Sequence, residues 1–172
     1  DAYGLRMMAD RLPELLVASS CSKNFGLYRE RTGSITLVAE SAEQAKIVSA
    51  QSMSIARQIY SMPPAHGALL VSLILGDDQL RANWQAELEE VRLRIKAMRT
   101  LLTDGINDNA AGMDFSHIKQ QQGMFSFLGI TSDQLNRLRD EFAIYIVGST
   151  RVNLAGINST NIDYLTQSIR TV

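Results

Sequence analysis

The longest regular pattern of apolar positions lies in the middle of the chain. Its members follow one another at spacings of three or four residues: Leu80, Trp84, Leu88, Val91, Ile95, Met98 and Leu102. Positions three and four apart share one face of an α-helix, so this pattern predicts a helix over about residues 78–104. At 1.5 Å per residue the helix would be about 40 Å long, which is enough to connect two domains. We interpret its apolar stripe as core packing.

Two short apolar runs near the start of the chain predict strands. They occupy residues 14–18 and 34–39, and each is typical of a strand that is covered on both faces. A turn rich in serine and glycine, residues 19–33, joins them. In the first half of the chain we also predict helices over residues 2–11, from Ser41 to about 59 and from Pro64 to about 75. After the long helix, the sequence predicts a loop over 103–112 and a hairpin-like stretch over 114–130. The last part predicts a helix from Thr131 to about 142, strands over 143–147 and 151–154, and a helix over 160–171.

Two of the predicted helices begin with a capping box. Ser41 is followed three residues later by Gln44, and Thr131 by Gln134. In this motif the hydroxyl accepts from a free backbone N–H while the glutamine side chain returns to the capping residue. Pro64 fits the first turn of the helix that follows it.

The order of elements predicts α/β material followed by a smaller α+β unit. We place the domains at residues 1–90 and 91–172, with the long helix bridging them. Two strands cannot form a covered parallel sheet alone, so we expect their partners to lie outside this sequence. The chain begins Asp-Ala-Tyr-Gly, without an initiator methionine or a signal-peptide pattern, and reads like the middle of a longer protein.

Composition indicates an ordinary globular protein. The 172 residues are 45% hydrophobic and 20% charged, and the net charge is −1. These values disfavour nucleic acid or an anionic membrane surface as a partner. A single cysteine, Cys21, excludes an internal disulfide and fits a reducing compartment, so we expect a cytoplasmic protein. His66 and His117 are isolated and lack metal-ligand spacing, so no metal site is predicted.

Lys23 is the most informative candidate for chemistry. It follows the first predicted strand, with Ser20 and Ser22 before it and Arg31 eight residues later. Hydroxyls and a guanidinium together suit a phosphate dianion, and a lysine amine whose pKa is lowered can attack a carbonyl. Without further information, Lys23 would equally be a surface lysine in a loop, because Ser-x-x-Lys is a weak pattern.

The wider segment Ser20-Cys-Ser-Lys-Asn-Phe-Gly-Leu-Tyr-Arg-Glu-Arg31 resembles the pyridoxal-phosphate lysine segment of class-I aminotransferases. The similarity is to the subgroup of aspartate and aromatic-amino-acid aminotransferases. Residues 57–67, 123–127 and 148–156 resemble three further segments of that family, in the same order. Met62 departs from the pattern, because the family commonly has asparagine there.

The resemblance implies a fold, a cofactor and site residues. The fold would be the C-terminal portion of the PLP-dependent transferase fold type I: the end of the large α/β domain, the long connecting helix and the small α+β domain. Lys23 would form the Schiff base with pyridoxal 5'-phosphate and move a proton, while Ser20 and Arg31 would bind the cofactor phosphate. Arg151 would bind the substrate α-carboxylate, with Phe125 near the substrate.

The implied reaction moves an amino group between aspartate, or an aromatic amino acid, and 2-oxoglutarate. Arg57 would bind the distal carboxylate of a dicarboxylic substrate. In the family this arginine reaches the neighbouring subunit, which implies a homodimer with shared active sites. The family's aspartate for the pyridine nitrogen and its glycine-rich phosphate loop have no matching segment here, so we expect the isolated chain to be inactive.

Several alternatives stay open at this point. Arg31, Arg57 and Arg151 would each be ordinary solvated cations without the resemblance, and Phe125 would be a core residue. The parent protein would be an aspartate or an aromatic-amino-acid aminotransferase. The chain by itself would be either part of such an enzyme or a non-catalytic fragment that self-associates through exposed apolar surface. We assign no thiol chemistry to Cys21.

Overall fold

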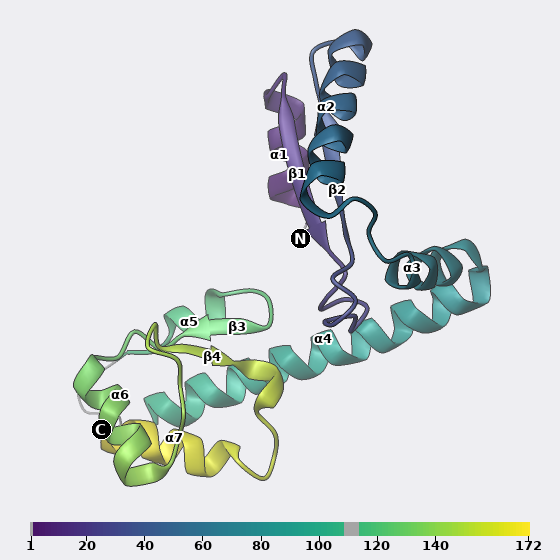
Figure 1. The fold of residues 1–172 in the computed structure, drawn as a ribbon. Coiled ribbons are helices and arrows are strands. Elements are labelled where there is room, and N and C mark those ends of the chain that lie inside the picture. Colours follow the sequence, from purple (N-terminus) through teal and green to yellow (C-terminus); the bar gives the residue numbers. More distant parts are fainter. Residues whose placement is uncertain (1, 109–113) are drawn as a thin grey trace. The chain divides into compact units, whose positions relative to one another are not determined.

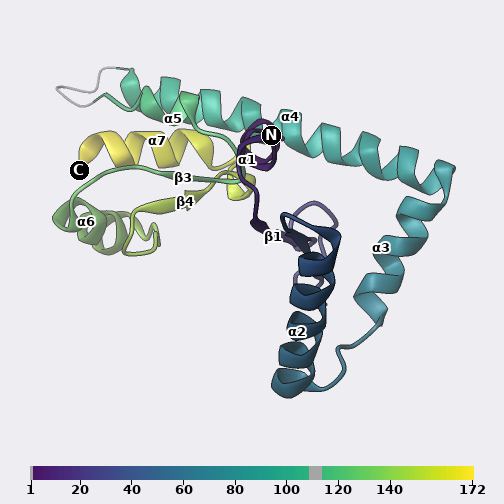
Figure 2. The same ribbon diagram turned by 90° about the horizontal axis from the view of Figure 1, so that it is seen from above.

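The computed structural model describes residues 2–108 and 114–172, and the chain divides into two compact units. Unit 1 ends at Ala86 and unit 2 begins at Glu87, and each is described by itself. The division lies inside α4 (Asp78–Asn107), which Figure 2 shows as one continuous helix. The predicted domain boundary after residue 90 lies in the same helix and stays a prediction.

Unit 1 is built on a two-stranded antiparallel ribbon. Its elements are α1 (Tyr3–Arg11), β1 (Leu15–Ser20), β2 (Gly33–Val38), α2 (Ala42–Tyr60), α3 (His66–Gly76) and the first part of α4. The register pairs Leu15 with Val38 at one end and Ser20 with Gly33 at the other. Figure 1 shows α2 running alongside the ribbon. The helices and strands predicted for this region are confirmed, except that α3 begins at His66, so Pro64 lies before the helix and not in its first turn.

The predicted covering of β1 and β2 is wrong for this chain. Leu16 is 67% exposed and Ile35 is 59% exposed, and neither strand contains a buried residue. A continuous apolar strand becomes buried only when elements pack on both of its faces. Within the described residues of unit 1, the ribbon is too narrow and too sparsely covered for that.

Unit 2 combines the second part of α4 with a small sheet and shorter helices. The elements are α5 (His117–Gln120), β3 (Phe125–Phe127), α6 (Ser132–Phe142), β4 (Arg151–Asn153), a 3₁₀ turn (Leu154–Gly156) and α7 (Ile162–Thr171). Strands β3 and β4 are antiparallel, with Phe125 opposite Asn153 and Phe127 opposite Arg151. The capping box at Thr131 is complete, which confirms the predicted start of α6.

The hydrophobic core lies in unit 2. It comprises Leu102, Ile106, Phe115, Ile118, Leu128, Ile130, Leu138, Val152, Leu154, Ile157, Ile162 and Ile169. Ile95 and Met98 of α4 pack against it. The predicted apolar stripe of α4 therefore reaches the core at its C-terminal end, whereas Val91 and Leu80 are exposed.

Helix α4 extends beyond its predicted end. The sequence predicts a loop from Thr103, but the helix continues to Asn107. The reason is packing at Gly105, where an added Cβ would lie 2.8 Å from Cγ2 of Thr166 on α7. A glycine is therefore needed at this helix contact, although it resembles a loop residue in sequence. Residues 109–113 of the predicted loop lie outside the described residues.

Three strand predictions in unit 2 need correction. The stretch 114–130 is not a hairpin, because it contains α5 followed by β3, and β3 pairs with β4. Residues 143–147 form no strand; the chain leaves α6 through a left-handed Ala143, and the backbone N–H of Ile144 donates to the Leu138 carbonyl at 2.9 Å. Strand β4 ends at Asn153, whose side chain caps the following 3₁₀ turn.

Among the helices that the structure describes, none combines the length and the apolar character needed to cross a membrane.

Candidate functional site

The loop between β1 and β2 brings three predicted site residues together. Ser20 is the last residue of β1, and the pairing continues past it because the Cys21 N–H donates to the Thr32 carbonyl at 3.0 Å. Lys23 and Arg31 therefore both belong to the loop that closes this end of the ribbon. The antiparallel register explains how residues eleven positions apart in sequence reach one place.

Serine hydroxyls stabilise the first half of this loop. The Ser20 hydroxyl donates to the Ser22 hydroxyl at 3.0 Å and accepts from the Ser22 N–H at 3.1 Å. Ser22 is buried, whereas Ser20 is exposed. The Ser20 oxygen is thus held at the end of β1 on the solvent side.

Lys23 is exposed, and its ammonium lies 5.7 Å from the centroid of the Tyr28 ring. A cation over an aromatic face within about 6 Å is weakly attracted to it. The structure therefore places the lysine amine over a loop residue, at the surface of unit 1.

Trp84 of α4 fixes the loop on the other side of Lys23. Its indole N–H donates to the Asn24 carbonyl at 2.7 Å, and its ring stacks on Phe25 with centroids 4.6 Å apart. The apolar period predicts Trp84 as part of a core stripe and does not predict this role. The available signal was the indole N–H, which requires a hydrogen-bond acceptor when the ring packs against protein.

Arg31 is the second predicted site residue of the loop that carries a positive charge. Its backbone has a φ of 52°, in the left-handed region, and its guanidinium donates to the Tyr28 carbonyl at 3.0 Å. A guanidinium has five N–H donors, so this bond leaves donors for an anion. Arg31 is exposed, as an anion-binding residue at a loop must be.

Both histidines take part in local contacts. Nδ1 of His66, at the start of α3, lies 3.1 Å from a Glu30 carboxylate oxygen, and Nε2 of His117 lies 3.1 Å from the Phe127 carbonyl. In the part of the chain that the structure describes, no three His, Cys, Asp or Glu residues are grouped as a metal site would need.

Arg57 lies on α2, outside the 21–32 loop. Its side chain is exposed, and its carbonyl accepts from the Ser61 N–H at 2.9 Å where the helix ends. Ser61 has a φ of 62°, and Met62 beyond it is 79% exposed. The structure thus displays Arg57 on the surface of unit 1, near the end of a helix.

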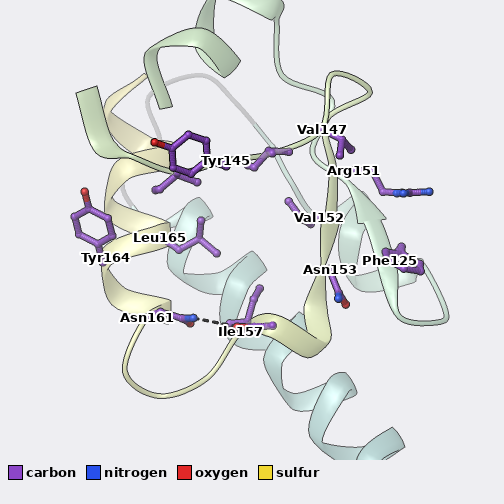
Figure 3. Close-up of a pocket in the computed structure, with 13 residues that line it drawn as sticks. Phe125, Tyr145, Val147, Arg151, Val152, Asn153, Ile157, Asn161, Tyr164 and Leu165 are labelled. Carbon is purple, nitrogen blue, oxygen red and sulfur yellow. Dashed lines mark hydrogen bonds between the residues drawn. The ribbon is translucent and has the colours of Figure 1, made fainter. Parts of the chain in front are cut away.

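Unit 2 contains a pocket of about 450 Å³ beside β4, shown in Figure 3. Apolar and aromatic residues dominate its lining, which also includes Arg151, Asn153 and Asn161. The Asn161 amide donates to the Gly156 carbonyl at 3.0 Å, and the Tyr164 hydroxyl donates to the Phe142 carbonyl at 2.7 Å. These bonds hold α7 against the segments that border the pocket.

Arg151 and Phe125 meet at this pocket. The Arg151 guanidinium carbon lies 4.8 Å from the centroid of the Phe125 ring, and Figure 3 shows both side chains on the same side of β4. Strand alternation explains the exposure, because Arg151 and Asn153 are exposed whereas Val152 between them is buried. A guanidinium over an aromatic ring is preorganised for two parallel N–H···O bonds to a carboxylate.

Five of the six predicted site residues therefore fall into two groups, each described within its own unit. Ser20, at the end of β1, and Lys23 and Arg31, in the loop that follows, lie at one end of the ribbon in unit 1, and Phe125 and Arg151 contact one another in unit 2. Arg57 stands apart from the first group, on α2. The first group offers an amine, a hydroxyl and a guanidinium, which suit a phosphorylated carbonyl compound. The second offers a cation beside an apolar pocket, which suits a small carboxylic acid.

Comparison with known proteins gives one consistent answer. The sequence model of the aminotransferase class I and II family matches residues 1–169. The aspartate aminotransferase of Haemophilus influenzae is 54% identical over 98% of this chain, and the aromatic-amino-acid aminotransferase of Pseudomonas aeruginosa is 45% identical over 100% of it. The chain spans 43% of the length of each. A solved aromatic-amino-acid aminotransferase of Burkholderia pseudomallei, covalently bound to pyridoxal phosphate, superposes on 99% of the chain with a TM-score of 0.92 and 40% identity, and 43% of that structure is covered.

Proposed function

The chain belongs to the class I and II aminotransferase family, and we propose that it supplies part of the active site of an enzyme that moves amino groups between aspartate and 2-oxoglutarate. The observation that carries this proposal is the loop that gathers Ser20, Lys23 and Arg31. An amine, a hydroxyl and a guanidinium at one end of a ribbon match the needs of a phosphorylated aldehyde.

The donor set fits pyridoxal phosphate. The Ser20 hydroxyl and the Arg31 guanidinium are exposed and would bind the phosphate dianion through charge-assisted hydrogen bonds. The Lys23 amine, on the same loop, would hold the aldehyde carbon. When bound, the cofactor supplies the electron sink for the reaction, while the protein supplies binding, orientation and proton transfer.

The remaining roles belong to residues of this chain. Lys23 Nζ would carry the proton that moves during transfer, because a lysine amine can act as both acid and base. Arg151 would bind the substrate α-carboxylate with its planar fork, and the Phe125 ring beneath it would restrict its orientation. The apolar lining of the pocket beside Arg151 would exclude water from the bound carboxylate.

Arg57 would select a dicarboxylic substrate. It is exposed on α2, so it is accessible to a carboxylate, and we propose that it acts in the site of a second copy within a homodimer. An aromatic-amino-acid aminotransferase is the second candidate, favoured by the 45% identity over the whole chain to the enzyme from Pseudomonas aeruginosa. Turnover of aspartate and of phenylalanine by the protein that contains this chain distinguishes the two.

Covalent labelling tests the role of the loop. The 172-residue chain is incubated with pyridoxal phosphate, reduced with borohydride and mapped by mass spectrometry. We expect Lys23 to be labelled several-fold faster than Lys46, an exposed lysine on α2 that serves as the matched control. Inorganic phosphate should compete for labelling at Lys23 and leave Lys46 unchanged.

Two variants complete the test. Arg31→Met should lower labelling at Lys23 and remove the competition by phosphate, because it removes the guanidinium that would bind the phosphate group. Lys46→Ala should leave labelling at Lys23 unchanged. Equal labelling of both lysines in the parent chain, with no effect of Arg31→Met, would contradict the proposed cofactor site.

A further inference from the structure

Arg99 is a buried arginine on α4 whose three hydrogen bonds all go to uncharged acceptors. It is 5% exposed. Its guanidinium donates to the Ile118 carbonyl at 3.2 Å, to the Gly123 carbonyl at 2.6 Å and to the Ser126 hydroxyl. Burial lowers the pKa of Arg99. A buried cation is tolerated only when its donors are satisfied, so these bonds fix Arg99 and its acceptors together.

The three acceptors belong to consecutive segments that lead into the pocket. Ile118 is in α5, Gly123 is in the turn that follows it, and Ser126 is in β3. Gly123 has a φ of 86°, a conformation that residues with a side chain rarely adopt. Arg99 therefore holds a short helix, a tight turn and a strand against α4.

The strand β3 transmits this constraint to the pocket. Successive side chains of a strand point to opposite faces. Ser126 is fully buried beneath Arg99, and its neighbour Phe125 lies on the other face, against the Arg151 guanidinium. The bond from Arg99 to Ser126 on the buried face of β3 therefore also determines the position of the Phe125 ring on the opposite face.

We propose that Arg99 is a positioning residue that holds β3 so that Phe125 supports the Arg151 guanidinium at the pocket. A second arginine of α4 binds the segment that follows the neighbouring strand, because Arg94 donates to the carbonyls of Ala155, in the 3₁₀ turn, and Ile157, just after that turn. Strand β3 and the turn that follows β4 are thus bonded to the same helix. The functional meaning of this arrangement rests on the proposed substrate role of Arg151.

Nuclear magnetic resonance of the full 172-residue chain tests the proposal without cofactor or substrate. The Phe125 ring should shift the side-chain protons of Arg151 upfield through its ring current. In Arg99→Met, which keeps an apolar side chain of similar length, we expect at least half of this upfield shift to be lost. Phe125→Leu, which removes the ring, defines complete loss.

Arg92→Met is the matched control. Arg92 lies on the same helix, and its partner among the described residues is Glu89 at the surface, so its removal should leave the Arg151 shift unchanged. Arg99→Lys restores the charge with fewer donors and should recover part of the shift. The methyl resonances of the core show independently whether Arg99→Met is folded. A folded Arg99→Met variant in which the Arg151 protons keep the upfield shift of the parent chain would overturn the proposal.

If Arg99→Met does not fold, Ser126→Ala decides the question. This variant removes one acceptor and leaves the carbonyls of Ile118 and Gly123 in place. It should reduce the upfield shift of the Arg151 protons, and an unchanged shift would contradict the proposal.

Succinate is then added to the parent chain as a probe of the proposed substrate role of Arg151. No response of Arg151 to succinate, with the ring-current shift present, would count against the proposed function and not against the role of Arg99.

Discussion

Among the described residues, the unit that begins at Glu87 encloses twelve buried apolar side chains, whereas the unit that ends at Ala86 encloses none. The two are similar in length and both contain regular helices and strands. In unit 1 the buried residues are Ser22 and Gly67, and the apolar positions of α2 and α3 are largely exposed. Regular secondary structure therefore does not imply a core.

The difference in buried apolar residues follows from how the helices and strands of each unit cover one another. In unit 2, α4, α5, α6, α7 and β4 all contribute buried apolar residues to one core, together with Leu128 and Ile130 just after β3. In unit 1, α2 accompanies a ribbon of two strands whose sequence suits a wider sheet covered on both faces. The chain spans 43% of the length of the two relatives described above, and the described residues of unit 1 leave both strands of this ribbon without a buried side chain.

The largest expected effect comes from truncating a core residue of unit 2. Leu102→Ala removes a fully buried side chain and should lower the free energy of unfolding of unit 2 by about 3 kcal/mol. Amides that exchange only through unfolding of this unit would then exchange roughly a hundredfold faster. Hydrogen exchange of α7, followed by mass spectrometry, measures the change.

The matched substitution in unit 1 is Leu73→Ala on α3, where the side chain is 62% exposed. We expect a cost below about 0.5 kcal/mol, because little apolar surface is lost from packing. Comparable losses from Leu73→Ala and Leu102→Ala would show that unit 1 packs a core in solution, and the contrast between the units would fail.

The sequence predicted the elements of unit 1 well and their burial poorly. Strands β1 and β2 occur where the apolar runs predict them, because local propensity and turn residues determine where a strand forms. Exposure of Leu16 and Ile35 could not be predicted, because burial depends on partners far from these residues. The same holds for residues 143–147, whose continuous apolar run fits a strand but which lack a strand neighbour among the described residues.

The candidate site was predicted at the level of residues and not of contacts. The segment around Lys23 identifies Ser20 and Arg31, and the hairpin register explains their proximity. The roles of Trp84 and Arg99 were not predicted, because each depends on a contact with residues 19 to 60 positions away. Both lie on α4, where the apolar period of the sequence predicts packing and gives no information about hydrogen bonds.

The helix caps provide an intermediate test of the comparison. Thr131 forms a complete capping box with Gln134, whereas at the start of α2 the Ser41 hydroxyl accepts from the Gln44 N–H at 3.2 Å. Thr131→Ala should lower the stability of unit 2 by about 1 kcal/mol, because α6 packs into the core through Leu138. Urea unfolding measured by circular dichroism and hydrogen exchange reports the change.

Ser41→Ala is the counterpart in unit 1. It should increase exchange in the first turn of α2 and leave unit 2 unaffected, because no residue of α2 is buried. Thr131→Ser keeps the hydroxyl and should retain most of the stability of the parent chain. A loss in unit 2 from Ser41→Ala as large as that from Thr131→Ala would indicate that the two units unfold as one.

The smallest expected effect is a pH dependence within unit 2. Hydrogen bonds from the Ser116 side chain and backbone lower the pKa of Asp114, and the Asn107 amide contributes a weaker bond. Because the folded-state pKa lies below the unfolded value of about 3.9, the ionised carboxylate stabilises unit 2 above that pH. This contribution is lost as the pH falls through the folded-state pKa.

A carbon-13 titration of the Asp114 carboxyl group should give a midpoint below the ordinary aspartate value, and Ser116→Ala should raise that midpoint. Fluorescence of Trp84, the single tryptophan and a residue of unit 1, should not follow this titration, since the carboxylate and its partners all belong to unit 2. An Asp114 midpoint at or above the ordinary value, or a Trp84 signal that changes with it, would remove the distinction between the units at this level.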